Sequence, residues 1–359
     1  MQSPGYRATA IDTPPRDWVQ FLACRAFYPM NIVEFAKILN LSIGTVSRAL
    51  NDRAEVSPKT RKMVLEKAEE LGFVRNSNAR RLVTGRNCMI RLECPHRTHI
   101  LSDQYLVELA RGVEEVAGDN GYDLLLHLGA RRSDAVDVQD VDGLVIVAGP
   151  ELTAGDLLHL TNGGRTPAVV IVGTAPPDFP AASYVCLDTL PGVREALTRL
   201  ATLGHRRVGY IGSGPPGYGL RDAFPQLMAD AGLHWDPDLA IEAGLTPDDG
   251  RRAARALLAL PSPPTALFAR TDVLASGAVQ GVTEMGKTVP GDVSVIGHDN
   301  IEAAALVNPP LTTVAINLPD VAALAVESLL AVITTGAAPT VRTLGTHLIV
   351  RRSCGPAPV

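Results

Sequence analysis

One short segment, residues 41–51, constrains this chain more than any other. Ser42 is a favourable helix N-cap, because its hydroxyl can accept a hydrogen bond from a free backbone N–H at the start of a helix. The apolar residues that follow fall at i, i+3 and i+4 and share one face: Val46, Ala49 and Leu50. The opposite face presents Ile43, Gly44, Thr45, Ser47 and Arg48. A helix with hydroxyls, one arginine and little bulk outside is suited to the major groove of DNA.

The neighbouring residues predict a helix on either side of this segment. The preceding stretch repeats apolar residues at i, i+3, i+4 and i+7, which indicates an amphipathic helix: Ile32, Phe35, Ala36 and Leu39. Asn40 then tolerates the left-handed backbone that a tight turn requires. A third helix is expected to have Ser57 as its N-cap, Pro58 in its first position and Gly72 at its end, with Val64, Ala68 and Leu71 packing it. Helix, short turn and helix form the helix-turn-helix arrangement.

Charge is divided unevenly along the chain. Residues 30–87 contain 11 Lys and Arg against 6 Asp and Glu, a net charge of +5. Residues 1–29 carry +1, so residues 88–359 carry −11 in a chain whose total is −5. A basic segment on an acidic body is typical of a modular DNA-binding protein. It argues against the alternative that the helices form a small bundle with no role in nucleic-acid binding.

Four sequence blocks in this region carry a family resemblance. They cover residues 42–51, 56–61, 70–73 and 76–82, in that order. Together they resemble the head-piece of the lactose-repressor (LacI/GalR) family of bacterial transcription regulators. One short motif is weak, but four in register are specific. The resemblance implies an all-α helix-turn-helix DNA-binding domain over residues 30–75 and a hinge helix or linker over residues 76–87.

The hinge segment is expected to contact DNA as well. The resemblance implies that it becomes helical when two subunits bind an operator, with Leu82 wedged into the minor groove and Asn76 and Ala79 nearby. An apolar wedge that unstacks a base step and bends DNA is a known physical strategy. The alternative is that Leu82 only anchors the linker on the body. Arg75 stands where relatives often have proline, which predicts a less stiff approach to the hinge.

Direct reading of bases is expected to be thin. The resemblance implies that the two residues after Ser42 choose the sequence, but Ile43 offers only a contact to a thymine methyl and Gly44 offers no side chain. Arg48 is the best candidate for a hydrogen bond to guanine. Hydroxyl and amide side chains are better placed for phosphates: Ser42, Thr45, Ser47, Asn51, Ser57 and Thr60. We therefore expect readout of DNA shape through the hinge to matter more.

The remainder of the chain alternates strand and helix patterns. Short, β-branched runs bounded by Gly or Pro predict buried parallel strands at 141–147, 168–172, 207–211, 265–268 and 293–296. Helical patterns lie at 103–120, 191–203, 247–260 and 274–285. Such alternation indicates doubly wound α/β sheets, and the resemblance implies a two-lobed periplasmic-binding-protein-like body that binds an effector and dimerises. We expect lobe 1 at about 88–203 and 315–340, lobe 2 at about 204–314 and 341–351, and a tail at 352–359, with interlobe crossings at 203–207 and 309–314.

A small-molecule effector, a sugar or a derivative of one, is implied at the carboxyl ends of the strands, facing the interlobe cleft. The residues that match the family's ligand positions are Asp188, Arg221, Thr271 and Asp299. The alternative for Asp188 and Asp299 is loop capping. His298 is expected to be packed or solvated rather than a ligand.

Several departures from the family pattern suggest a changed or degraded pocket. Pro216 stands where relatives have an anchoring arginine, Ile316 replaces a polar residue, and Arg270 is an added charge. The chain from 128 to 141 is too short for the helix that relatives have there. Arg91 and Glu93 are expected to interrupt the first apolar strand.

Composition excludes several classes of protein. The five cysteines are odd in number and lack metal spacing, so neither a disulfide framework nor a zinc site is expected, and reduced thiols fit a cytoplasmic protein: Cys24, Cys88, Cys94, Cys186 and Cys354. No cofactor is implied. No apolar run is expected to reach the roughly 18 residues that span a membrane. Residues 1–29 lack the core of a signal peptide, and we expect a disordered arm or a mis-assigned start before Met30.

The sequence therefore predicts a DNA-binding transcriptional regulator, a repressor, that binds a palindromic operator in double-stranded DNA as a homodimer and is modulated by an effector. One alternative is a regulator whose degraded pocket makes it independent of an effector. Another is an α/β enzyme, since the fold admits many chemistries. The enzyme is disfavoured because the chain has no glycine-rich phosphate loop, nucleophile elbow or His-Glu-x-x-His motif.

Overall fold

The computed structural model describes residues 30, 32–50, 55–71, 86–95, 101, 103–127, 141–149, 151–173, 178–212 and 220–358. The chain divides into two compact units, Met1–Arg86 and Asn87–Val359. In the described part of the first unit, the helices are α2 (Ile32–Ile38), α3 (Ile43–Leu50) and α4 (Pro58–Glu70). Their apolar faces form one core: Phe35, Ala36, Val46, Ala49, Leu50, Val56 and Val64. The predicted helix-turn-helix pattern and its packing residues are confirmed.

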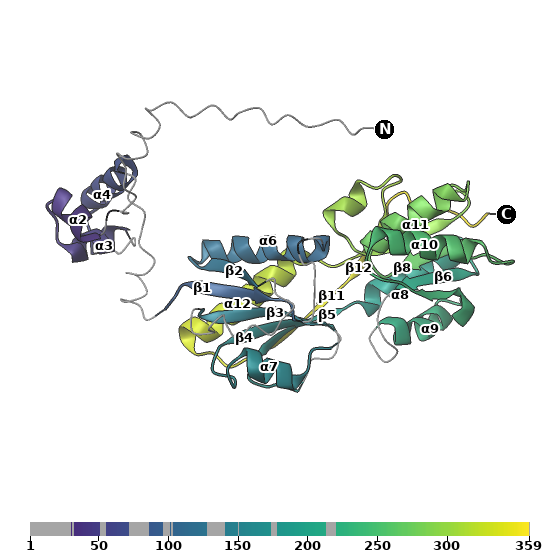
Figure 1. Cartoon of the computed structure of the whole chain (residues 1–359), viewed down its shortest axis with the longest axis horizontal. Coiled ribbons are helices and arrows are strands. Elements are labelled where there is room, and N and C mark those ends of the chain that lie inside the picture. Colours follow the sequence, from purple (N-terminus) through teal and green to yellow (C-terminus); the bar gives the residue numbers. More distant parts are fainter. Residues whose placement is uncertain are drawn as a thin grey trace, which may run out of the picture. The chain divides into compact units, whose positions relative to one another are not determined.

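The second unit contains two sheets of six described strands each (Figure 1). The lobe 1 sheet has the order β11-β5-β4-β3-β1-β2, and each pair in it is parallel. Its strands are β1 (Met89–Glu93), β2 (Asp123–His127), β3 (Gly143–Val147), β4 (Ala168–Val172), β5 (Ser183–Asp188) and β11 (Val341–Gly345). Its described helices are α6 (Gln104–Asp119), α7 (Ala154–Leu160) and α12 (Leu318–Thr335).

The lobe 2 sheet has the order β12-β10-β9-β8-β6-β7, and only the β10–β12 pair in it is antiparallel. Its strands are β6 (Val208–Gly212), β7 (Ala240–Glu242), β8 (Ala266–Ala269), β9 (Ser294–Asp299), β10 (Thr312–Ala315) and β12 (His347–Ile349). Its described helices are α8 (Leu190–Thr202), α9 (Leu220–Asp230), η3 (Pro237–Leu239), α10 (Pro247–Leu258), α11 (Asp272–Glu284) and η4 (Glu302–Ala305). The two doubly wound α/β sheets confirm the predicted fold class.

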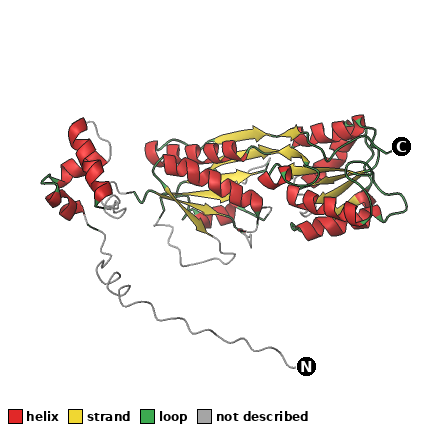
Figure 2. Ribbon diagram, turned by 90° about the horizontal axis from the view of Figure 1, so that it is seen from above, coloured by secondary structure: helices red, strands yellow, loops and turns green. Residues whose placement is uncertain are grey.

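Helices cover both faces of each sheet (Figures 1 and 2). In lobe 1, α6 and α12 share a core with one face and α7 packs on the other. In lobe 2, α10 and α11 cover one face, while α8 and α9 cover the other. Sheets buried on both faces explain the almost continuous apolar runs of strands such as β3 and β4, in which all five residues are buried.

The crossings between the lobes differ from those predicted at 203–207 and 309–314. Helix α8, expected in lobe 1, packs its buried Val193, Ala196 and Leu197 into the lobe 2 core with α9, so the chain crosses at Thr189. It returns only after β10, which remains in lobe 2. Strand β11, expected in lobe 2, pairs with β5 of lobe 1, which places the third crossing at Thr346.

The last residues do not behave as the predicted tail. Ser353 is fully buried; its carbonyl accepts a hydrogen bond from Val295 N, and its hydroxyl accepts one from Thr312 N. His205, also fully buried, contacts the carbonyl of Gly355 through Nε2 at 3.0 Å and the hydroxyl of Thr265 through Nδ1 at 2.8 Å. These contacts attach the C-terminal segment to the amino ends of the strands in the lobe 2 sheet, β9 and β10 among them.

Two further expectations need correction. Arg91 and Glu93 do not interrupt β1, because both are buried and their side chains approach to 3.3 Å, with His127 Nδ1 2.8 Å from the same carboxylate. Helix α12 does have the length and composition to cross a membrane. Here its apolar residues pack in the lobe 1 core, which marks it as the buried helix of an α/β layer.

Candidate nucleic-acid interface and effector site

The first turn of α3 is built on Ser42. Its Oγ accepts a hydrogen bond from Thr45 N at 3.1 Å, and the two hydroxyl oxygens lie 2.8 Å apart. The turn before it places Asn40 in the left-handed region, with φ of 52°. With Val46, Ala49 and Leu50 in the core, the helix turns its other side outward, where Ile43 is 46% exposed and Gly44 and Arg48 are also exposed. The face predicted for DNA is therefore a surface.

Gly44 and Arg48 are related in space. A Cβ added at Gly44 would lie 3.6 Å from Arg48 Nη2 and 3.8 Å from Ser42 Oγ. The guanidinium therefore lies back along the helix surface, over the turn that contains the glycine. Gly44 has no side chain to contact a base, and it leaves open surface beside Arg48, the one cationic donor among the described residues of this face.

Helix α4 begins in the same way as α3. Ser57 Oγ accepts from Thr60 N at 3.1 Å, and the two hydroxyl oxygens are 2.8 Å apart. Both helix N-termini are capped by a Ser-x-x-Thr pair, and such termini favour phosphate because their N–H groups and dipole attract anions. Of the other residues predicted to contact DNA, Thr45 and Ser47 are half-buried in α3. Asn51, Asn76, Ala79 and Leu82 lie outside the described residues, as does most of the predicted hinge.

In the body, the side chains of two predicted effector residues accept hydrogen bonds from backbone N–H groups in the first turn of a helix. Asp188 Oδ1 accepts from Leu190 N at 3.1 Å at the start of α8. Thr271 Oγ1 accepts from Leu274 N at 3.1 Å and caps α11. The capping alternative is therefore what Asp188 does in this structure. Arg221 of α9, the third candidate, pairs with Glu242 Oε2 at 3.3 Å.

Asp299, the fourth candidate, lies in a strained loop at the carboxyl end of β9. Its φ is 110° and that of Asn300 is 61°, and non-glycine residues in such regions are rare and cluster at functional sites. Asp299 Oδ1 is 2.9 Å from His298 Nδ1. His298 is buried, as expected for a packed histidine.

The strained loop is held by Asp272, which follows the predicted effector residue Thr271 but is not itself among the predicted effector residues. Its carboxylate, 1% exposed, accepts hydrogen bonds from Thr313 Oγ1 at 2.6 Å and from Ile301 N at 3.0 Å. Burial, followed by the charge of Asp299, raises the pKa of Asp272 to about 8. The sequence signals were the match of the pair Thr271-Asp272 to Asn-Asp in the family and the position of Asp272 just before a predicted helix. Neither reveals its burial, which comes from three separate elements.

The two lobes touch through α6 and η4. Glu108 Oε1 of α6 accepts from Glu302 N at 2.8 Å, which supplies the cap that Ile301 does not give η4. Arg111 Nη2 lies 2.5 Å from Glu302 Oε1. Tyr105 packs against the apolar clusters of both lobes. Burial raises the pKa of Glu108. Because η4 follows Asp299 and Asn300 directly, this contact joins the candidate effector loop to the opposite lobe.

The backbone crossings are also joined. Thr346 N donates to the carbonyl of Asp188 at 3.1 Å, and Thr346 Oγ1 donates to the carbonyl of Thr189 at 3.1 Å. Gly192 N in turn donates to Thr346 Oγ1 at 3.2 Å. The first and third crossings therefore form one hydrogen-bonded hinge next to Asp188.

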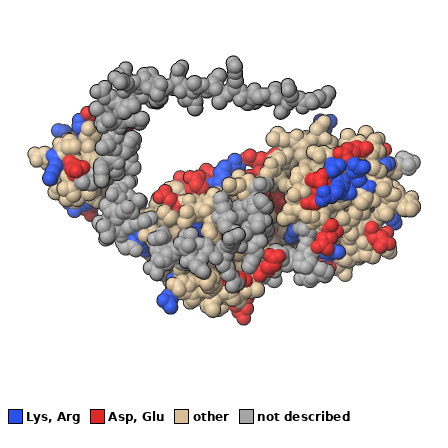
Figure 3. All heavy atoms as spheres, viewed as in Figure 1, with Lys and Arg blue, Asp and Glu red and all other residues tan. Residues whose placement is uncertain are grey.

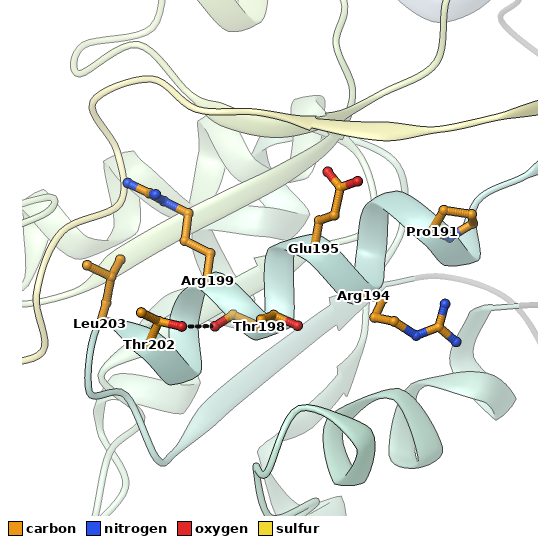
Figure 4. A pocket seen from close by; sticks show the side chains of 7 residues that line it. All are labelled: Pro191, Arg194, Glu195, Thr198, Arg199, Thr202 and Leu203. Atoms are coloured by element: carbon orange, nitrogen blue, oxygen red, sulfur yellow. Dashed lines mark hydrogen bonds between the residues drawn. The ribbon is translucent and has the colours of Figure 1, made fainter.

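Two hollows of the described surface lie elsewhere. One, of 590 Å³, runs along α8 and is lined by residues such as Arg194, Glu195 and Arg199 (Figure 4). The other, of 260 Å³, lies beside β7 and α10. Neither is lined by any of the four predicted effector residues. In Figure 3, acidic and basic side chains lie side by side on lobe 2, where the arginines of α10 pair with neighbouring carboxylates.

Comparison with known proteins assigns both units. Residues 31–76 match the family described as bacterial regulatory proteins, lacI family, and residues 197–354 match the periplasmic binding protein-like domain. The chain is 31% identical over 350 residues to the HTH-type transcriptional regulator AglR of Rhizobium meliloti (strain 1021), covering 92% of this chain and 96% of that protein. It is 30% identical to the HTH-type transcriptional repressor CytR of Escherichia coli (strain K12), covering 77% and 81%.

Solved structures agree with these relatives. A transcriptional regulator CelR–cellobiose complex matches with a TM-score of 0.64 and 27% identity, over 90% of this chain and 99% of that one. The lac repressor dimer bound to operator and the anti-inducer ONPF matches in fold, with a TM-score of 0.68 and 22% identity, over 90% of this chain and 99% of that one. These relatives and neighbours are transcriptional regulators and not enzymes.

Proposed function

Because the chain belongs to the lacI family of DNA-binding transcriptional regulators, we propose that it represses its target genes by binding a palindromic operator as a homodimer. The observation that carries this proposal is the exposed face of α3, where Arg48 lies beside Gly44 on a helix held by three buried apolar residues. Arg48 would donate to a guanine edge, while the capped N-termini of α3 and α4 would bind phosphates and set the register.

We infer a dimer because one helix-turn-helix domain can recognise only a few base pairs. A single helix with one arginine and one isoleucine discriminates few bases, whereas two heads on a two-fold site double the contacts and fix the spacing of the half-sites. The lac repressor, which shares this fold, was solved as a dimer bound to its operator. A regulator of this kind acts where the DNA is, in the bacterial cytoplasm.

We further propose that a small-molecule effector, a sugar or a derivative of one, binds beside the Asp299 loop and biases lobe closure. The strained loop, its buried support Asp272 and the Glu108–Glu302 contact between the lobes favour this proposal over an effector-independent regulator. A ligand that contacts Asp299 would shift the equilibrium between lobe arrangements by no more than the difference between its binding free energies for those arrangements. The hydrogen bonds that Asp188 and Thr271 make to helix N–H groups favour the alternative, a regulator that is independent of an effector. A screen for effector binding decides between the two hypotheses.

The DNA proposal is tested with selected operator fragments and the full chain in gel-shift titrations. We expect Arg48→Ala to weaken binding by about 1–3 kcal/mol and to relax the preference at one base pair of each half-site. The matched control is Lys62→Ala, because Lys62 is exposed on α4 and pairs only loosely with Glu66 at 3.8 Å. If Arg48→Ala kept both the affinity and the base preference of the parent chain, Arg48 would not be a reading residue.

A further inference from the structure

Lobe 2 contains a buried polar group that no described residue satisfies. Tyr210 of β6 is 2% exposed, and its hydroxyl has no hydrogen-bond partner among the described residues. Its ring is fixed by aromatic neighbours, with centroid distances of 4.7 Å to Phe224, 6.3 Å to Phe268 and 6.5 Å to Trp235. Buried hydroxyls in folded proteins almost always have partners, so an unpaired one that cannot turn away needs an explanation.

The hydroxyl points toward the carboxyl end of the lobe 2 sheet. A Cβ added at Gly212, the last residue of β6, would lie 2.5 Å from Tyr210 Oη, so the hydroxyl occupies the space above that glycine. On the neighbouring strand, Phe268 pairs with Tyr210, and Arg270 N donates to the carbonyl of Ile211 at 2.8 Å, which continues the register. Arg270 directly follows β8, and continued alternation along the chain would carry its side chain to the same face as Phe268 and Tyr210.

Two arginines and two carboxylates lie around this point, and one of the arginines has no carboxylate partner in the described part of the chain. Arg270 forms no side-chain hydrogen bond or ion pair with another described residue. Arg221 lies on the same side of the sheet and is paired with the exposed Glu242. Burial raises the pKa of Tyr210, the two arginines lower it, and the exposed Asp222 opposes them less strongly. The phenol therefore remains a neutral donor that feels the charge of two guanidinium groups.

We propose that Tyr210 Oη and the guanidinium of Arg270, with Arg221 next to them, bind an oxyanion group of the effector. The effector would then be an acidic molecule, such as a phosphorylated or carboxylated sugar, and not a neutral one. Arginine suits this role because its planar donors match two oxygens of a phosphate or carboxylate. This inference rests on the proposed function and deepens it by naming the chemical class of the effector.

The test is the thermal stability of the full chain titrated with sodium phosphate, and separately with sodium acetate, each against sodium chloride at equal ionic strength. A ligand that binds only the folded chain raises Tm saturably, so we expect a rise in the phosphate arm, the acetate arm or both. The arm that responds identifies the anion. Arg270→Gln should abolish the rise. The control Arg206→Gln removes an exposed arginine just before β6, at the amino ends of the strands in the same sheet. This variant should keep the rise in Tm.

Tyr210→Phe separates binding from packing. Removing an unpartnered buried hydroxyl should leave the Tm in chloride unchanged or slightly higher, while reducing the rise produced by the anion. A loss of Tm in chloride, or an anion response equal in Arg270→Gln and the parent chain, would overturn the assignment. A chain that binds its operator but ignores both anions would refute the anion site alone. A chain that binds the anion through Arg270 but no operator would refute the proposed function alone.

Discussion

Gly192, in the first turn of α8, is where the hinge has least room. A Cβ added there would lie 2.6 Å from Val314 Cγ1, 2.8 Å from Thr346 Oγ1 and 3.1 Å from His347 N. Carbon atoms in contact are normally about 3.5–4.0 Å apart, so Gly192→Ala requires a displacement of about 1 Å. Val314 is fully buried and β-branched, so it cannot turn aside, and movement of Thr346 would break its bonds to the first crossing.

The expected cost follows from these contacts. Overpacking of a core typically costs about 1–3 kcal/mol, and alanine in a helix returns up to about 1 kcal/mol relative to glycine. We expect a net loss of about 1–2 kcal/mol, which lowers Tm by roughly 2–8 °C in a body of this size. Differential scanning calorimetry of the full chain measures it.

The matched control is Gly118→Ala. Gly118 is an exposed residue of α6 whose added Cβ meets nothing within 4 Å, so this change should stabilise the chain by about 0.5–1 kcal/mol. Val314→Ala should cost less in the Gly192→Ala background than in the parent chain, because it removes the clashing methyl group. Equal Tm gains in the two glycine variants, or strict additivity of the pair, would refute the reasoning.

Three further outcomes are expected. In the folded chain the pKa of Asp272 is raised from 3.8 to about 8, so between these pH values the folded chain holds a proton on Asp272 that the unfolded chain releases. The unfolding free energy should therefore fall as pH rises from about 4 to about 8. Asp272→Asn should flatten this dependence of stability on pH in urea titrations. Burial lowers the pKa of His205, so stability should also fall as pH drops below about 6.5, where the unfolded chain takes up the proton first; a His205→Gln chain with the parent's acid slope would contradict this. Glu302→Gln weakens an ion pair in which the side chains of Arg111 and Glu302 are 62% and 68% exposed, so it should leave the unfolding free energy nearly unchanged; a clear loss by chemical denaturation would show that the contact between the lobes is structural.

The head could be predicted almost residue by residue because its determinants are local. Ser42 and Ser57 cap helices through hydroxyls three residues from their partners, and the buried faces repeat at helical spacing. The order of strands and helices in the body was equally predictable from apolar runs. Register within each sheet and the sheet to which an element belongs are long-range properties, which periodicity does not contain.

The crossing at Thr189 shows why that information is missing. Helix α8 has an apolar face that would suit either sheet, and a helix that follows a strand is expected to return to the sheet of that strand. Here α8 packs instead on β10 and β12 of lobe 2, because Gly192 allows close approach to Val314 and Thr346. The boundary therefore lies at 189 and not at the predicted 203, and Gly192 leaves the room that this packing needs.

The effector residues show a different limit of sequence reasoning. Motifs place Asp188 and Thr271 at strand ends, but only the structure shows that each already accepts a helix N–H, so part of the bonding capacity of each is used within the fold. Tyr210 has the opposite character, since it reads as a core aromatic while its hydroxyl lacks a partner among the described residues. A motif records where a family contacts ligands, whereas an unsatisfied buried group records where this chain still has bonding capacity. The acidic effector is therefore argued from Tyr210 and Arg270 and not from the aspartates.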